Sequence, residues 1–199
     1  PETIAKLVEI AQLARANQEK HLVLITGVPG AGKTLAGLQL VYDNYFGDVG
    51  SERTAVFLSG NGPLVEVLQH ALNSKVFVQD VHGFLKQYGG SSARIPEEHI
   101  WIFDEAQRAW DADRVSGKRG KKLSEPEDFL WIGEKKTDWT MMVGLIGEGQ
   151  EIHLGEEAGL GQWADAIKSM PSSWVVSCPP HVEVLFSEIE AVRTFSELD

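Results

Sequence analysis

Residues 27–34 have the types and the spacing of a loop that binds phosphate. They read Gly27-Val28-Pro29-Gly30-Ala31-Gly32-Lys33-Thr34, which fills every fixed position of the pattern G-x-x-x-x-G-K-[ST]. The glycines let backbone N–H groups approach phosphate oxygens closely, and Lys33 adds a positive charge between the β- and γ-phosphates. The Thr34 hydroxyl is an oxygen ligand that suits Mg²⁺. The segment therefore predicts a site for a nucleoside triphosphate and Mg²⁺.

A pair of carboxylates later in the chain can supply the second half of such a site. The apolar run 100–103 is followed directly by Asp104-Glu105-Ala106-Gln107. Asp104 at a strand tip can hold Mg²⁺ directly or through water, while Glu105 can orient or deprotonate an attacking water. These residues predict hydrolysis of the nucleotide, with Glu105 and Lys33 as catalytic residues and with Thr34 and Asp104 at the metal.

The elements that must position these residues alternate between strands and helices. We expect strands at 22–26, 54–59, 76–78, 100–103, 141–146 and 174–176, and helices at 4–14, 34–41, 64–72, 81–88, 127–135 and 160–170. Nearly all-apolar strands such as 100–103 are typical of parallel strands that are covered on both faces. The pattern predicts a three-layer α/β fold, with a mostly parallel sheet, helices on both faces and ligands beyond the carboxyl ends of the strands.

Composition and charge narrow the class of protein. The 199 residues suit one domain, and 18 basic against 29 acidic residues give a net charge of −11. This charge argues against a surface that grips nucleic acid through bulk positive charge. The single Cys178 excludes an internal disulfide and a cysteine-built zinc site. Because no signal peptide and no apolar stretch of ~20 residues is visible, we expect a cytoplasmic protein without membrane contact.

Three segments, in their order along the chain, resemble motifs I, II and III of superfamily-one helicases. They are the phosphate loop, the Asp104-Glu105-Ala106-Gln107 box and Gly147-Glu148-Gly149-Gln150-Glu151-Ile152. The chain looks closer still to the schlafen-group helicase-like ATPases, whose signatures resemble Phe57-Leu58-Ser59-Gly60-Asn61-Gly62-Pro63-Leu64, Phe103-Asp104-Glu105-Ala106-Gln107-Arg108-Ala109-Trp110 and Gly149-Gln150-Glu151-Ile152-His153. The resemblance implies a RecA-like P-loop NTPase fold and an ATPase that uses ATP and Mg²⁺ and acts on DNA or RNA.

The resemblance also implies roles for residues outside these two halves of the site. Gln150 matches the motif III glutamine that senses the γ-phosphate, with a surface-loop glutamine as the alternative. Ser59 and Asn61 stand where motif Ia meets a single strand, and His82 looks like the histidine of a nearby T-x-H element, with a capping or core histidine as the alternative. Arg193 faintly resembles the motif IV arginine of a second RecA-like domain, with a solvated helix residue as the alternative.

The resemblance further predicts how the domain is organised. We expect a RecA-like ATP-binding domain at residues 1–178, and at 179–199 a segment that leads toward a second RecA-like domain absent from this chain. Alone, the chain would then be weakly active. Two other functions stay open: a nucleotide-gated switch or assembly ATPase that moves no strand, and a P-loop small-molecule kinase with basic residues of 114–122 as a lid. The choice between DNA and RNA, the adenine specificity and the oligomeric state stay open as well.

Overall fold

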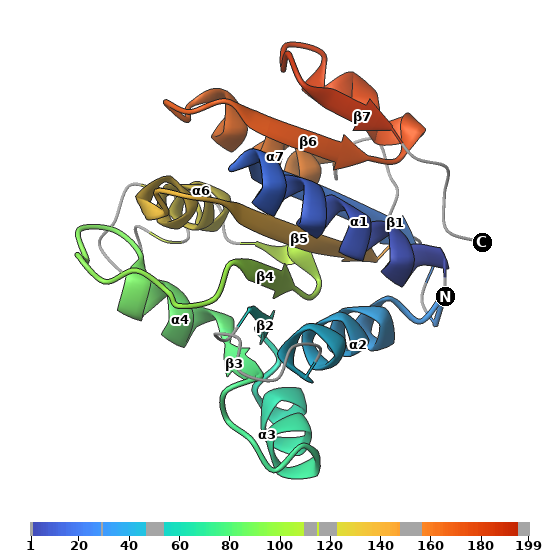
Figure 1. Cartoon of the computed structure of the whole chain (residues 1–199), viewed down its shortest axis with the longest axis vertical. Helices are drawn as coiled ribbons and strands as arrows, with labels where there is room; N and C mark the ends of the chain where they lie inside the picture. Colours follow the sequence, from blue (N-terminus) through green and yellow to red (C-terminus); the bar gives the residue numbers. More distant parts are fainter. Residues whose placement is uncertain are drawn as a thin grey trace.

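A single parallel sheet forms the centre of the protein. The computed structural model describes residues 2–28, 30–46, 54–109, 115, 123–147 and 157–194. Its strands are β1 (Lys20–Gly27), β2 (Ala55–Ser59), β3 (Val78–Asp80), β4 (Ile100–Phe103), β5 (Thr140–Gly147), β6 (Trp174–Cys178) and β7 (Val192–Thr194). Within these residues the seven strands pair in the order β3-β2-β4-β5-β1-β6-β7, and every pairing is parallel (Figure 1). All carboxyl ends of the strands therefore lie at one edge of the sheet.

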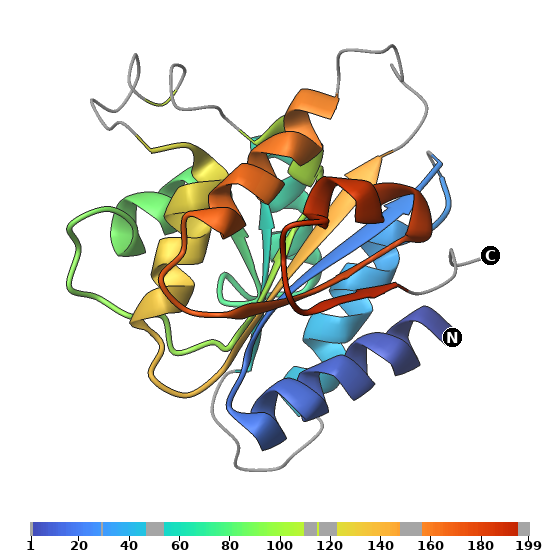
Figure 2. The same ribbon diagram turned by 90° about the horizontal axis from the view of Figure 1, so that it is seen from above.

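Helices cover both faces of the sheet. One face carries α1 (Glu2–Asn17), α2 (Lys33–Phe46) and α3 (Gly62–Ala71), and the other carries α4 (Val81–Tyr88), α6 (Glu125–Lys135), α7 (Glu157–Lys168) and the 3-10 helix η2 (Pro180–Phe186). Figure 2 shows α1 and α2 on one side of the strands and α6 and α7 on the other. Side chains of β1 alternate between the two cores, with Leu22 on one face and Val23 on the other, both fully buried. The predicted three-layer α/β fold is confirmed.

Helix α2, which contains the last two residues of the phosphate loop, packs closely against the sheet at Gly37. This contact fixes the position of the helix. An added Cβ at Gly37 would lie 2.9 Å from Leu145 Cδ1 and 3.0 Å from atoms of Ile102 and Phe57. The cost of overpacking a core keeps larger residues out of such a contact.

None of the helices in the described part of the chain is long and apolar enough to cross a membrane.

The sheet differs from the sequence-based expectation at its two edges. Strand β3 begins at Val78 rather than at residue 76, although Phe77 O still accepts a hydrogen bond from Phe57 N at 2.8 Å. Strand β7 is not indicated by the sequence pattern, because its three residues are only partly buried or exposed and show no alternation. Arg193 lies in β7, so the interpretation of this residue as part of a helix is wrong.

Residues 179–194 pack onto the domain. Val182 and Phe186 of η2 are buried in the same core as β6, and β7 hydrogen-bonds to β6 in register. The sheet thus continues past residue 178, where we had placed the end of the domain. The expected role of residues 179–199 as a lead toward a second domain stays a prediction.

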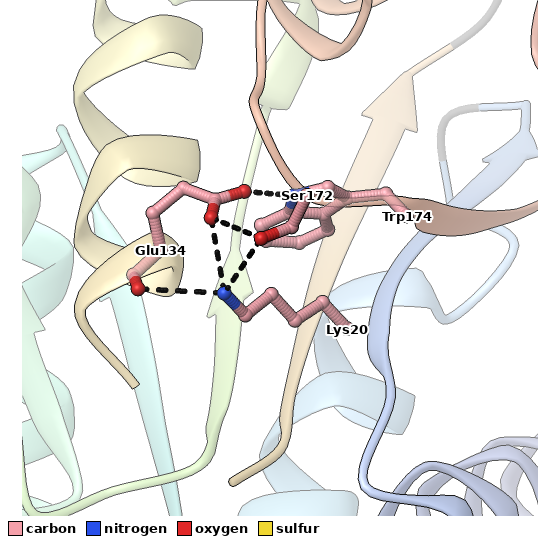
Figure 3. A network of polar contacts seen from close by, with 4 residues as sticks. All are labelled: Lys20, Glu134, Ser172 and Trp174. Atoms are coloured by element: carbon pink, nitrogen blue, oxygen red, sulfur yellow. Dashed lines mark hydrogen bonds and ion pairs between the residues drawn. The ribbon is translucent and has the colours of Figure 1, made fainter. Parts of the chain in front are cut away.

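A partly buried polar network joins three elements at the amino edge of the sheet (Figure 3). The Glu134 carboxylate of α6 accepts hydrogen bonds from Lys20 Nζ at 3.1 Å, Ser172 Oγ at 2.6 Å and Trp174 Nε1 at 2.8 Å. The Lys20 and Glu134 side chains are only 13% and 8% exposed. Next to it, a Cβ on Gly133 would lie 2.5 Å from Trp174 Cη2, so α6 can approach β6 only with glycine there. The network ties α6 to β1 and β6.

We expect Glu134→Gln to lower the free energy of unfolding in a pH-dependent way. Burial raises the pKa of Glu134, but the hydrogen bonds from Ser172, Trp174 and Lys20 outweigh burial and bring the pKa below its ordinary value of 4.5. A carboxyl whose pKa is lower in the folded state stabilises the fold above pH 4.5, and this stabilisation is lost as the pH falls through the folded-state pKa. At pH 7 the variant should lose roughly 1–3 kcal/mol, the scale of hydrogen bonds to a charged group.

Urea denaturation at pH 7 and at about pH 3 measures this effect. The difference between the two proteins should shrink at the lower pH, because the stabilisation by the charged Glu134 is lost as the pH falls through its lowered folded-state pKa. Glu190→Gln, on an exposed side chain, is the matched control. Equal stability of Glu134→Gln and the unaltered protein at pH 7 would contradict the prediction.

Candidate nucleotide-binding site

The phosphate loop joins β1 to α2 at the carboxyl edge of the sheet. Gly30 and Gly32 have φ values of +83° and +81°, in the region that favours glycine, while an added Cβ at either would meet no atom within 4 Å. The backbone conformation, and not a lack of space, therefore requires these glycines. Lys33 begins α2, and its Nζ donates to Gly27 O at 2.6 Å and to Val28 O at 2.9 Å. The ammonium group thus lies over the loop.

The two predicted metal ligands lie in contact. Thr34 Oγ1 donates to Asp104 Oδ1 at 3.2 Å, and Asp104 is 6% exposed at the end of β4. Burial raises the pKa of Asp104, and the charge of Glu105 adds to this; the hydrogen bond from Thr34 and the charge of Lys33 oppose the rise without cancelling it. A divalent cation beside this desolvated carboxylate would relieve that cost.

Thr34 and Asp104 suit Mg²⁺, which needs few protein ligands, better than a cation whose ligands all come from the protein. The described ranges contain no group of three or more His, Cys, Asp and Glu side chains that could hold a metal ion. Mg²⁺ typically takes one or two protein ligands and fills its shell with phosphate oxygens and water. Thr34 and Asp104 would supply the protein's share of that shell.

Glu105 has a strained backbone and a carboxylate held by its neighbours. Its φ is +55°, the left-handed region that non-glycine residues rarely adopt and that is often found at functional sites. Its Oε2 accepts a hydrogen bond from Gln107 Nε2 at 2.6 Å and lies 3.4 Å from Arg108 Nε. The side chain is 46% exposed. Glu105 therefore presents a carboxylate to solvent beside the buried Asp104.

Both halves of the predicted site line one cavity. Its volume is about 520 Å³. The phosphate loop and the first turns of α2 form one wall, and Glu105, Gln107, Arg108 and Gly147 form the other. A cavity of this size, with convergent polar groups, is typical of small-molecule sites. Sequence reasoning assigned no role to Gln107 or Arg108, and the only signal was their place within the segment that resembles the family signature.

The three residues predicted to meet nucleic acid lie together at the ends of β2 and β3. Ser59 is 2% exposed, and its Oγ accepts a hydrogen bond from Asn61 N at 3.2 Å. Asn61 in turn caps α3 by accepting from Leu64 N at 3.3 Å. His82 Nδ1 lies 2.9 Å from Glu125 Oε1, and the His82 side chain is 31% exposed. Ser59 and Asn61 thus build the turn, while Asn61 and His82 offer exposed surface.

Of the remaining predicted residues, Arg193 lies away from the cavity. Arg193 pairs with Ser177, which pairs with Val23, so Arg193 lies level with the middle of β1 and well short of its carboxyl end at Gly27. Pro29 and Gln150 lie outside the described residues.

Comparison with protein families decides the affiliation of the chain. Residues 20–189 match the family described as "Schlafen group 3, DNA/RNA helicase domain". The chain belongs to this family. The resemblance seen in the sequence is thereby confirmed, and the matched range includes both halves of the candidate site, from Gly27 to Gly147. The range that matches the schlafen group 3 family does not include α1 or β7.

Comparisons with individual proteins add little to the family match. A search of curated proteins gives no match. Among solved structures, the chain is similar to the crystal structure of the Pyrococcus furiosus Hef helicase domain, with 13% sequence identity and a TM-score of 0.45. The similarity covers 92% of this chain and 36% of that chain. The chain thus spans about a third of the length of this helicase structure.

Proposed function

We propose that this chain is the ATP-binding domain of a helicase-like motor, which binds MgATP, hydrolyses it and acts on DNA or RNA. The family match supports the helicase-like class. The contact of Thr34 with Asp104, beside a cavity that Thr34 lines together with Lys33 and Glu105, is the observation that supports the nucleotide chemistry. It joins a phosphate cradle, a cation site and a carboxylate within reach of the same small molecule.

The residues at the cavity would have separate roles in hydrolysis. The β- and γ-phosphates would lie over the loop, where Lys33 would exchange the carbonyls of Gly27 and Val28 for phosphate oxygens. Thr34 and Asp104 would hold Mg²⁺, which would supply positive charge that neutralises the phosphates. Glu105 would orient a water whose oxygen forms a bond to the γ-phosphorus. The bond from that phosphorus to the bridging oxygen breaks, ADP leaves with the electron pair, and the water's proton passes to Glu105.

No contact among the described residues specifically favours either of the two alternative functions. The kinase hypothesis depends on a lid of basic residues at 114 and 118–122, which lie outside the described residues. The cavity instead contains a half-exposed carboxylate, Glu105, which suits activation of water. A nucleotide-gated switch would use the same binding residues and differs only in the response to nucleic acid.

Stimulation of ATP hydrolysis by nucleic acid tests the proposal. In the native protein that contains this chain, we expect single-stranded DNA or RNA to raise the rate of ATP hydrolysis. Separate titrations with DNA and RNA of the same base sequence identify the partner. Hydrolysis that neither strand stimulates would favour the switch, and a protein that hydrolyses no ATP would contradict the proposal as a whole.

A further inference from the structure

Gln107 makes two hydrogen bonds that join the two sides of the carboxyl edge. Its Nε2 donates to Glu105 Oε2 at 2.6 Å, and its Oε1 accepts from Gly147 N, at the end of β5, at 3.2 Å. The first contact comes from the same turn, whereas the second reaches across to another strand. The side chain therefore connects the Glu105 carboxylate to the backbone of β5.

The amide of Gln107 satisfies both contacts at once. A carboxylate oxygen can only accept, so the group facing Glu105 must be a donor, and a backbone N–H can only donate, so the group facing Gly147 must be an acceptor. The two contacts require the same orientation of the amide. Glutamate would lack the donor, lysine would lack the acceptor, and methionine of similar size would lack both.

The backbone that carries Gln107 is held firmly from the other side. The 3-10 helix η1 (Ala106–Arg108) lies against α7. Trp163 is fully buried, and its Nε1 donates to Ala106 O at 3.1 Å. An added Cβ on Gly159 of α7 would lie only 2.6 Å from Gln107 O. The backbone of Gln107 is thus fixed by α7 and its side chain by β5, so the amide is a rigid point of attachment for Glu105.

We propose that Gln107 is a positioning residue, which holds the Glu105 carboxylate over the cavity at the place where it meets the attacking water. The inference rests on the proposed ATP hydrolysis. Glu105 needs such support because its own side chain is half exposed and its other neighbour, Arg108, is 68% exposed and lies at 3.4 Å. An exposed ion pair of this kind fixes geometry weakly. A carboxylate misplaced by about 1 Å can cost on the order of 10²-fold in rate.

A double-mutant cycle with Glu105 tests the proposal. In the native protein, we expect Gln107→Met to lower kcat by about 10- to 100-fold and to leave the Kd for MgADP within about twofold, because the change affects the placement of the carboxylate and adds no charge to the cavity. In a Glu105→Gln background, the same substitution should change kcat by less than about twofold, since the group it positions is already gone. Single-turnover assays measure the slow variants.

Controls separate positioning from a structural role. Gln107→Glu, which keeps the size and lacks the donor to Glu105, should lower kcat as Gln107→Met does, while Gln87→Met makes the same chemical change as Gln107→Met on an exposed part of α4 and should leave kcat unchanged. Equal losses of kcat with and without Glu105, or an unchanged kcat in both Gln107 variants, would overturn the inference. If the unaltered protein bound MgADP but hydrolysed no ATP, the proposed function would fail first, and this inference with it.

Discussion

Glu105→Gln is expected to slow ATP hydrolysis by about 10²-fold or more and to leave the affinity for MgATP within about twofold. Glutamine keeps the size of the side chain but cannot accept the proton of the attacking water. Nucleotide affinity should survive because the phosphate contacts come from the loop and from Lys33, and the predicted metal ligands are Thr34 and Asp104. Steady-state hydrolysis and equilibrium binding of a nonhydrolysable ATP analogue measure the two quantities in the native protein.

Asp104→Asn gives the informative contrast. It removes the charge from the side chain that contacts Thr34, so it should weaken Mg²⁺-dependent binding, whereas Glu105→Gln should not. Glu66→Gln, on an exposed part of α3, is the control for loss of a carboxylate elsewhere. Normal hydrolysis by Glu105→Gln would mean that another residue is the base.

A second large effect is expected for nucleotide binding itself. MgADP at about 100 times its Kd should stabilise the folded protein by ~2.7 kcal/mol, which raises the melting temperature by about 5–10 °C for a domain of this size. Lys33→Ala should remove most of this shift, because the variant lacks the charge that lies over the loop at Gly27 and Val28. Thermal denaturation with and without MgADP measures the shift.

The comparison must use the ligand-induced shift and not the melting temperature alone. In the absence of ligand Lys33 donates to two loop carbonyls, so its removal changes the stability of the loop as well. Lys86→Ala, an exposed lysine of α4, is the matched control and should keep the full shift. An undiminished shift in Lys33→Ala would refute the assignment of the phosphate site.

The two halves of the candidate site could be predicted from the sequence because each is local. Thr34 directly follows Lys33 and Glu105 directly follows Asp104, and each pair comes soon after an apolar strand that the sequence reveals. Parallel strands bring their carboxyl ends to one edge of the sheet, so the pairs were expected to meet there. The contact of 3.2 Å between Thr34 and Asp104 agrees with that expectation.

The roles of Gln107 and Arg108 could not be predicted because they depend on the backbone conformation. Both contacts of these residues with Glu105 arise in a turn where Glu105 has a φ of +55°, and residue types do not indicate such an angle at a glutamate. The bond to Gly147 further depends on the pairing of β5 beside β4, which brings together residues that are distant in the sequence.

The edge strand β7 was missed for a different reason. Its three residues are too few to show alternation, and pairing with β6 stabilises a segment whose own sequence favours no structure strongly. Arg193 was therefore interpreted from a faint resemblance alone. Tertiary pairing, which a local pattern does not contain, decided its conformation.

The place of β5 in the sheet has a consequence for the width of the site. Since β5 lies between β1 and β4, the phosphate loop and the carboxylate pair leave the sheet from strands that are not neighbours. Adjacent strands lie about 4.8 Å apart, so the axes of β1 and β4 are roughly 10 Å apart. Strand β4 ends level with Leu24, before β1 reaches the phosphate loop. Strand β5 ends level with Gly27 at Gly147, where an added Cβ would lie 3.2 Å from Gln107 Nε2. Strand β5 is thus a spacer between the strand that carries the phosphate loop and the strand that carries the carboxylate pair, and its lack of a side chain at Gly147 leaves room for the Gln107 amide.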